Sequence, residues 1–128
     1  MKNTPEYITY LEPNQVFVFG SNLRGRHGAG AAKQALKFGA RMGQGRGFCG
    51  QTYAIPTKGR NMEVLPLWRI ERAVSRFLDY AWRHPELEFL VTRVGCGLAG
   101  YKDKDIAPMF HTHPGANLFL HVILPEGW

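Results

Sequence analysis

The sequence has little cysteine and no long hydrophobic run, and each shortage excludes a class of protein. Cys49 and Cys96 fit neither a CxxC nor a zinc spacing, and two thiols do not make a disulfide framework. No run of about 18 apolar residues occurs, and residues 1–6 lack the apolar stretch of a signal peptide. We therefore expect a cytoplasmic protein with no membrane partner and no structural disulfides.

Acidic residues are also few. Ten Asp and Glu stand against sixteen Lys and Arg, which gives a net charge of +6. The basic residues form no consecutive block and do not interleave with aromatic residues as in a recognisable DNA- or RNA-binding motif. The positive field favours anionic partners, but it does not distinguish a small nucleotide from a nucleic acid.

The order of the apolar segments predicts the fold class. The chain of 128 residues has the length of one domain, and we expect residues 1–128 to form one. Strand-like and helix-like segments alternate, which is typical of a largely parallel sheet with helices on both faces. The expected strands are 8–11, 16–19, 53–55 (closed by Pro56), 89–94 and 118–124, with a turn at 12–15. The expected helices are 28–36, 66–83 and 103–109.

The helix at 66–83 has the clearest pattern. Its apolar residues recur at helical spacing, and the face that they form is expected to be buried. They are Ile70, Val74, Phe77, Leu78 and Ala81. Trp68 and Trp82 are expected to pack on this helix.

A glycine-rich stretch at 19–32 follows the strand at 16–19 and leads into a helix. Glycines let backbone N–H groups approach an anion closely, and a helix N-terminus adds unpaired donors. No Lys-Ser/Thr pair follows the glycines, so this is not a P-loop. The candidate ligand-binding residues here are Ser21, Asn22, His27, Gly28, Ala29 and Gly30. The alternative is a turn that only connects a strand and a helix.

A second glycine-rich stretch, 92–101, follows the strand at 89–94. Its backbone donors can surround a pyrophosphate, although a tight turn would need glycines as well. The candidates are Gly95, Cys96, Gly97, Leu98, Ala99, Gly100 and Tyr101. Tyr101 suits either stacking on a ribose or base or packing in the core.

Thr57 and Lys58 lie just past the strand at 53–55. A lysine at this place can contact a phosphate or, when desolvated, act as a nucleophile. The competing interpretation is a solvated surface charge. His111 and His113 could share one face of a strand, with His121 nearby in sequence. Zinc usually needs three or four ligands, and neither the ligand count nor the spacing supports such a site, so we expect no metal site and no cofactor.

Together these three motifs resemble the macro domain, the ADP-ribose-binding module. The likeness is closest to the lysine-dependent ADP-ribosyl glycohydrolases and the antitoxin-like enzymes that remove ADP-ribose from DNA. It rests on Asn22 with the His-Gly-Ala-Gly-Ala run at 27–31, on Pro56-Thr57-Lys58, and on the GCGLAG run at 95–100, and it covers about residues 16–125. The resemblance implies a three-layer α/β/α sandwich with a mostly parallel mixed sheet.

The resemblance also implies roles for the matched residues. Asn22 would bond the distal ribose, residues 28–30 would face that ribose and the diphosphate, and residues 95–100 would surround the diphosphate. Lys58 would attack or polarise the anomeric carbon, which requires a neutral amine. Macro domains usually place an aspartate after the first strand to hold the adenine amine, but no aspartate precedes Asp79 here, so Glu12 or a backbone group would serve instead.

Two functions follow as hypotheses. In the first, the protein binds ADP-ribose or a related nucleotide diphosphate and uses Lys58 to hydrolyse ADP-ribose from a modified protein or nucleic acid. In the second, it is a non-catalytic binding module, a reader or sponge for ADP-ribose or a signalling nucleotide. A lysine that points into the pocket favours the enzyme, and a lysine in solvent favours the binder.

Overall fold

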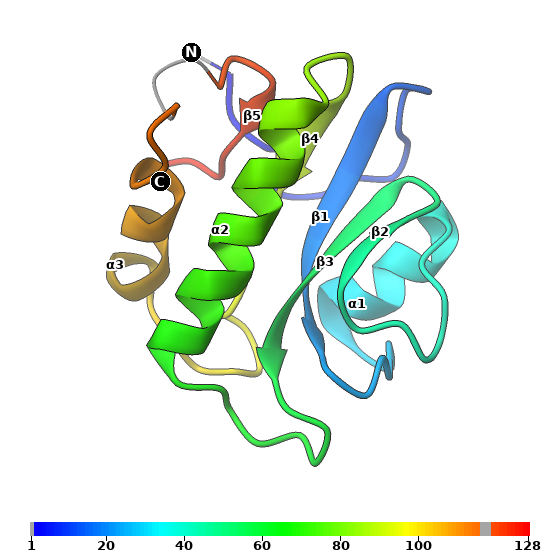
Figure 1. Cartoon of the computed structure of the whole chain (residues 1–128). Coiled ribbons are helices and arrows are strands. Elements are labelled where there is room, and N and C mark those ends of the chain that lie inside the picture. The colour runs from blue at the N-terminus through cyan, green and yellow to red at the C-terminus, as the bar shows by residue number, and fades with distance from the viewer. Residues whose placement is uncertain (1, 116–118) are drawn as a thin grey trace.

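The computed structural model describes residues 2–115 and 119–128, which form an α/β fold around a five-stranded, mostly parallel mixed sheet (Figure 1). The strands are β1 (Gln15–Asn22), β2 (Gly47–Cys49), β3 (Thr52–Lys58), β4 (Glu88–Val91) and β5 (Val122–Ile123). Their order across the sheet is β2-β3-β1-β4-β5, and only β2 is antiparallel to its neighbour. The expected α/β class with a largely parallel sheet is confirmed.

Helices cover both faces of this sheet. They are α1 (Gly30–Ala35), α2 (Leu67–Arg83) and α3 (Asp103–Ile106), with the short 3-10 turns η1 (Leu36–Phe38) and η2 (Ala107–His111). Val16 and Val18 of β1 pack in a cluster with α2 and α3. Phe17 and Phe19 pack on the other face with α1. Side chains alternate along a strand, so β1, at the centre of the sheet, contributes to both cores.

The helix α2 agrees most closely with its sequence pattern. Ile70, Val74, Phe77, Leu78 and Ala81 are all buried, as their spacing predicts. Pro66 precedes the helix and His84 follows it. Trp68 and Trp82 do not pack as expected, because they lie off the buried face and are 58% and 48% exposed.

Two expectations about strands were wrong, and one strand was not expected. Residues 8–11 are not a strand. Ile8 and Leu11 are instead buried against the α1 face. Strand β3 was expected to close at Pro56, but it continues through Pro56 to Lys58. Strand β2 was not expected, because no alternation of apolar residues indicated it, and it pairs only with the first part of β3. The missing N–H of Pro56 is tolerated because that side of β3 has no partner there.

The remaining elements follow the predicted order with shorter bounds. The turn at 12–15 closes through a bond from the Gln15 N–H to the Glu12 carbonyl at 2.9 Å. Gly39 ends η1 with a φ of 103°, in the left-handed region that favours glycine. Strand β4 stops at Val91 and β5 contains only Val122–Ile123. The expected start of the last strand, at 118, lies outside the described residues.

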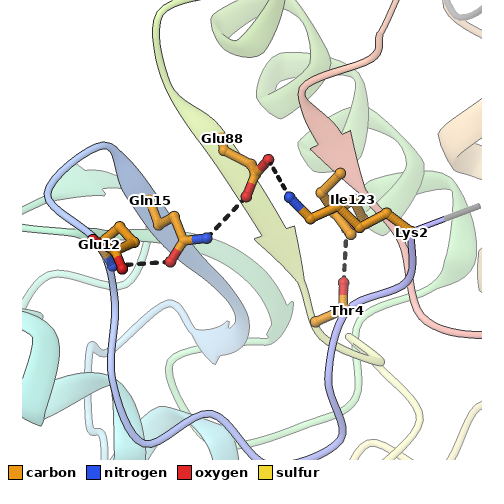
Figure 2. Close-up of polar contacts among 6 residues, drawn as sticks. All are labelled: Lys2, Thr4, Glu12, Gln15, Glu88 and Ile123. Carbon is orange, nitrogen blue, oxygen red and sulfur yellow. Dashed lines mark hydrogen bonds and ion pairs between the residues drawn. The ribbon is translucent and has the colours of Figure 1, made fainter.

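Polar contacts hold the first residues of the chain against β4 and β5 (Figure 2). Glu88 on β4 accepts bonds from Lys2 at 2.8 Å and from Gln15 at 2.9 Å. Thr4 donates its hydroxyl to the Ile123 carbonyl and its N–H to the Leu124 carbonyl, both at 2.8 Å. The bonds to Glu88 lie at the amino ends of β1 and β4, whereas the bonds of Thr4 lie at the carboxyl end of β5.

Among residues 2–115 and 119–128, no helix combines the length and hydrophobicity that crossing a bilayer requires.

Candidate functional site

A cavity of about 480 Å³ lies at the carboxyl ends of β1, β3 and β4. The loops that follow these strands gather at the lower end of the molecule in Figure 1. Ligands of open α/β sheets bind at this end. The cavity is lined by Gly20, Ser21, Asn22, Arg26, residues 28–32, Thr57, Lys58, Met62, residues 92–95 and residues 97–99. All three sequence motifs therefore contribute to one cavity.

The loop after β1 is held by its own polar side chains. The Asn22 side chain donates to the Arg26 carbonyl at 2.8 Å and accepts from the Arg26 N–H at 2.9 Å. The Ser21 hydroxyl donates to the Gly45 carbonyl, and the Thr57 hydroxyl donates to the Ser21 carbonyl at 3.3 Å. These three residues line the cavity, but their side chains are also engaged in fixing its wall.

Glycines form much of the remaining wall. Gly30 has a φ of 58° and Gly95 a φ of 77°, so both adopt a left-handed conformation. A Cβ on Gly28 or Gly97 would have no atom within 4 Å, so the backbone at these two positions borders open space. The α1 helix that follows has only six residues, and the expected contribution of its dipole is correspondingly small. The exposed loop backbone is the stronger anion-binding feature.

Lys58 lies at the end of β3 and is half-buried at the cavity wall. It stands opposite Asn22 in the β1–β3 register, where the pairing shifts by one residue. No ion pair joins Lys58 to another residue of the described ranges. Lys58 thus lines the cavity, and no carboxylate of the described residues forms an ion pair with its amine.

Two arginines that the sequence reasoning did not select also line the cavity. Arg26 is exposed on the loop after β1. Arg93 follows β4 and is held by an ion pair to Asp103 at 2.7 Å and a bond to the Glu126 carbonyl at 2.8 Å. The nearby indole of Trp128 and the guanidinium of Arg93 lower the pKa of Asp103. With Lys58, these residues give the described lining three cations and no acidic side chain.

Met62 also reaches the cavity, and its position depends on the turn at 59–63. The Gly59 N–H bonds the Glu63 carbonyl at 2.8 Å, and Met62 adopts a φ of 65°. Positive φ at a non-glycine residue is uncommon. Gly59 and Asn61 suit a turn, but the positive φ falls on Met62, which is neither glycine nor asparagine, so the sequence did not indicate its place at the cavity.

Four of the candidate residues lie outside the cavity lining. His27 is 1% exposed and shares its Nε2 between the carbonyls of Arg41 and Gln44, at 3.0 and 3.1 Å. Tyr101 donates to the Leu65 carbonyl at 2.7 Å and packs against the core. Cys96 also packs there, and burial raises the pKa of its thiol to about 11. Gly100, with a φ of 85°, serves the turn that returns to Tyr101.

Glu12 cannot hold an adenine in this cavity. It precedes β1, next to Gln15 at the amino end of the sheet (Figure 2). The cavity begins at Gly20, five residues along β1 from Gln15, and an extended chain rises about 3.3 Å per residue. The proposal of Glu12 as the adenine contact was therefore wrong.

The histidines of the carboxyl-terminal part serve local contacts. His113 bonds Asp79 at 2.9 Å, and His121 bonds the Ala81 carbonyl at 2.7 Å. Within the described ranges, no group of three or more His, Cys, Asp or Glu side chains is arranged to hold a metal ion.

Comparisons with protein-family models, with curated proteins and with solved structures found no match for this chain. Its function has to be inferred from the cavity itself.

Proposed function

We propose that the protein is a macro-domain-like three-layer α/β/α sandwich that binds ADP-ribose or a related nucleotide diphosphate in this cavity. The observation that carries the proposal is the meeting of two glycine-rich loops, after β1 and β4, with Lys58 at the end of β3. Backbone N–H groups at such loops suit phosphate oxygens. A volume of about 480 Å³ is within the usual range of roughly 300–1,000 Å³ for small-molecule sites.

The charge of the lining supports the same ligand class. Arg26, Lys58 and Arg93 surround the glycine loops, and the described lining contains no carboxylate that would repel a diphosphate. Leu98 is 76% exposed at the rim and offers an apolar surface to a ribose or base. The combination favours a ligand with a central diphosphate and less polar ends.

In the enzyme version of this proposal, Lys58 acts on the anomeric carbon of the distal ribose. Its neutral amine forms a bond to that carbon while the bond to the target atom breaks, and the target leaves with the electron pair and takes up a proton. Water then displaces the amine and releases ADP-ribose. The chemistry needs no metal or redox partner, and it suits a half-buried lysine beside the ligand.

A binding module without turnover is the second candidate, and one observation favours it. The described lining contains Lys58 but no carboxylate or imidazole that could transfer a proton. General acid–base catalysis relies mainly on such groups. A reader or sponge for ADP-ribose needs only the loops and their charge.

Calorimetry tests the binding proposal that both versions share. We expect ADP-ribose to bind at least about tenfold more tightly than AMP, a difference of about 1.4 kcal/mol. ADP is the intermediate probe, because it has the diphosphate without the distal ribose. Equal affinity for ADP-ribose and AMP, or no heat with any of the three, would contradict a site built for a diphosphate and a second ribose.

A further inference from the structure

A second cavity, of about 500 Å³, lies between α2 and the β2–β3 side of the sheet. We call it the arginine cavity, because Arg46, Arg69, Arg72 and Arg76 line it. Figure 1 shows the elements that contribute its lining, with α2 crossing the sheet and β2 at the margin. Nothing in the proposed diphosphate site uses these residues.

The arginines converge because of their positions on two elements. Residues 69, 72 and 76 are spaced three and four apart, so they share one face of α2. Arg46 directly precedes β2 and faces them from the sheet side. Three arginines on one helix face could simply be exposed surface residues. The fourth, Arg46, comes from a different segment of the chain, so the grouping is not a property of the helix alone.

These positive charges are not neutralised by the protein. The described lining of the arginine cavity includes no aspartate or glutamate. None of the four guanidinium groups takes part in an ion pair within residues 2–115 and 119–128. The phenol of Tyr53 lies in the same wall, where burial raises its pKa and the fields of Arg76 and Arg46 oppose that rise. The cavity therefore concentrates positive charge.

An aromatic surface lies beside this charge. Trp68 lines the cavity and is 58% exposed, and the Arg72 guanidinium carbon lies 6.0 Å from its ring centroid. Phe48 of β2 is 40% exposed and stacks on Tyr80 at the same side of the sheet, with ring centroids 5.4 Å apart. An exposed indole next to unpaired arginines is suited to a ligand that has both flat rings and negative charge.

We propose that the arginine cavity binds single-stranded nucleic acid, with backbone phosphates on the guanidinium groups and a base on Trp68. Non-specific single-strand binding combines these two components, a positively charged groove and aromatic stacking surfaces. A duplex would keep its bases paired and away from Trp68, and an acidic peptide would supply the charge without the rings. The proposal goes beyond the diphosphate site and does not require it.

The two cavities are neighbours at the end of β1 and β3. Leu23 and Pro56 line the arginine cavity, and the adjacent Asn22 and Thr57 line the glycine-rich cavity. A strand held by the arginines would pass close to Lys58. If the proposed function holds, the modified target is then a nucleic acid.

The test measures fluorescence anisotropy of an unmodified, labelled twelve-residue oligothymidylate, with an oligouridylate of equal length as a second probe. We expect the triple variant Arg69→Gln/Arg72→Gln/Arg76→Gln to bind at least tenfold more weakly than the wild type. The log–log slope of its salt dependence should fall by about 0.7 for each phosphate that the variant no longer neutralises. Trp68→Ala should weaken binding by about fivefold or more, since it removes a stacking surface.

A matched variant controls for charge. Lys33→Gln/Lys37→Gln/Lys104→Gln removes the same three charges from exposed positions outside the arginine cavity. It should retain affinity within about threefold, because long-range charge is screened over about 10 Å at 0.1 M salt. Circular dichroism verifies that both triple variants fold. We expect both to fold, because all six substituted side chains lie outside the buried core.

Several results would overturn the proposal. These are equal losses in the two triple variants, no effect of Trp68→Ala, or equal binding of a duplex, of polyglutamate or of a single nucleotide. Calorimetry with ADP-ribose on the same arginine variant separates the two proposals. Retained ADP-ribose binding with abolished oligonucleotide binding supports independent sites, and the oligonucleotide result stands whether or not ADP-ribose binds.

Discussion

Lys58 combines three properties that rarely coincide in a surface lysine. It ends a buried strand, it lines a cavity, and it has no carboxylate partner among the described residues. Cys96, although it lies in a glycine-rich loop, has the opposite environment. Burial raises the pKa of its thiol to about 11, and a thiol that stays protonated is a poor nucleophile. Of these two residues, Lys58 is therefore the one that the proposed chemistry can use.

Substitution of Lys58 separates catalysis from binding. If the protein is a hydrolase, Lys58→Ala should reduce turnover on the order of 10³-fold or more, because a nucleophile acts mainly in the transition state. The Kd for ADP-ribose should change by less than about tenfold, or 1.4 kcal/mol. The measurement uses ADP-ribosylated protein and ADP-ribosylated single-stranded DNA as substrates.

Lys58→Arg is the matched control, because a guanidinium keeps the charge but stays protonated. Full activity in this variant would contradict covalent lysine chemistry. Absence of turnover by the wild type on both substrates would leave the binding module as the function.

Sequence reasoning located the residues whose position follows from a strand end, and missed those placed by tertiary contacts. Asn22 and Lys58 end adjacent parallel strands, so their meeting was predictable. Arg93 reaches the cavity wall held by Asp103 and Glu126, which are distant in sequence. His27 looked like part of a ligand loop, but its ring is buried among the carbonyls of 41 and 44. A lone sequence cannot show which side of a loop faces inward.

The loop after β4 presents its backbone to the cavity, and Gly97 is where this matters most. Its φ is not in the left-handed region, and a Cβ there would meet open space. Gly95, by contrast, has a φ of 77° and a Cβ would lie 3.2 Å from the Ile106 side chain. Only the first of these glycines can be replaced without straining the fold.

We expect Gly97→Val to weaken ADP-ribose binding by roughly 10- to 100-fold while the fold is retained, because overpacking a filled site costs about 1–3 kcal/mol. Ligand titration beside thermal unfolding measures both effects. Gly97→Ala, with a smaller side chain, should give a smaller loss. Undiminished affinity in the valine variant would mean that the loop only connects β4 to α3.

Elements with a strong internal pattern were predictable, and those defined by their neighbours were not. The five buried positions of α2 follow from helical spacing alone. Strand β2 has three residues and exists because it pairs with β3. Residues 8–11 have strand-like composition, but they do not form a strand. Whether residues 47–49 and 8–11 form strands depends on their pairing partners, and a local sequence pattern does not contain that information.

The two ends of β1 and its neighbouring strands have different surroundings. Both cavities adjoin the carboxyl ends of β1 and β3, whereas the amino ends are tied by Lys2, Gln15 and Glu88 (Figure 2). Changes at the tied end should therefore affect unfolding and leave the ligand sites intact.

Glu88→Gln tests this expectation. Bonds from Lys2 and Gln15 lower the pKa of Glu88, so its contribution to stability is present above the ordinary glutamate pKa of 4.5 and is lost as the pH falls through the lowered value. At pH 7 we expect a loss of about 0.5–1 kcal/mol, since Lys2 is largely exposed and the pair is screened. The difference from wild type should shrink in acid.

Denaturant unfolding at pH 7 and pH 3 measures this effect. Glu6→Gln, which removes the same charge from an exposed position, should cost less at pH 7. A constant difference at both pH values would show that Glu88 acts through packing rather than charge.

The bonds from Thr4 have a consequence for self-association. Strand β5 is the outermost strand on its side, and Thr4 occupies the carbonyls of Ile123 and Leu124 that would otherwise face solvent. Open strand margins are templates on which other chains add as further strands and aggregate. The strands at both margins are short, with two residues in β5 and three in β2, but β2 follows Arg46, whose positive charge repels a second copy of the chain. Removal of residues 2–4 would thus expose the carbonyls at the β5 margin of the sheet. We expect such a truncated protein to remain folded but to precipitate at high protein concentration.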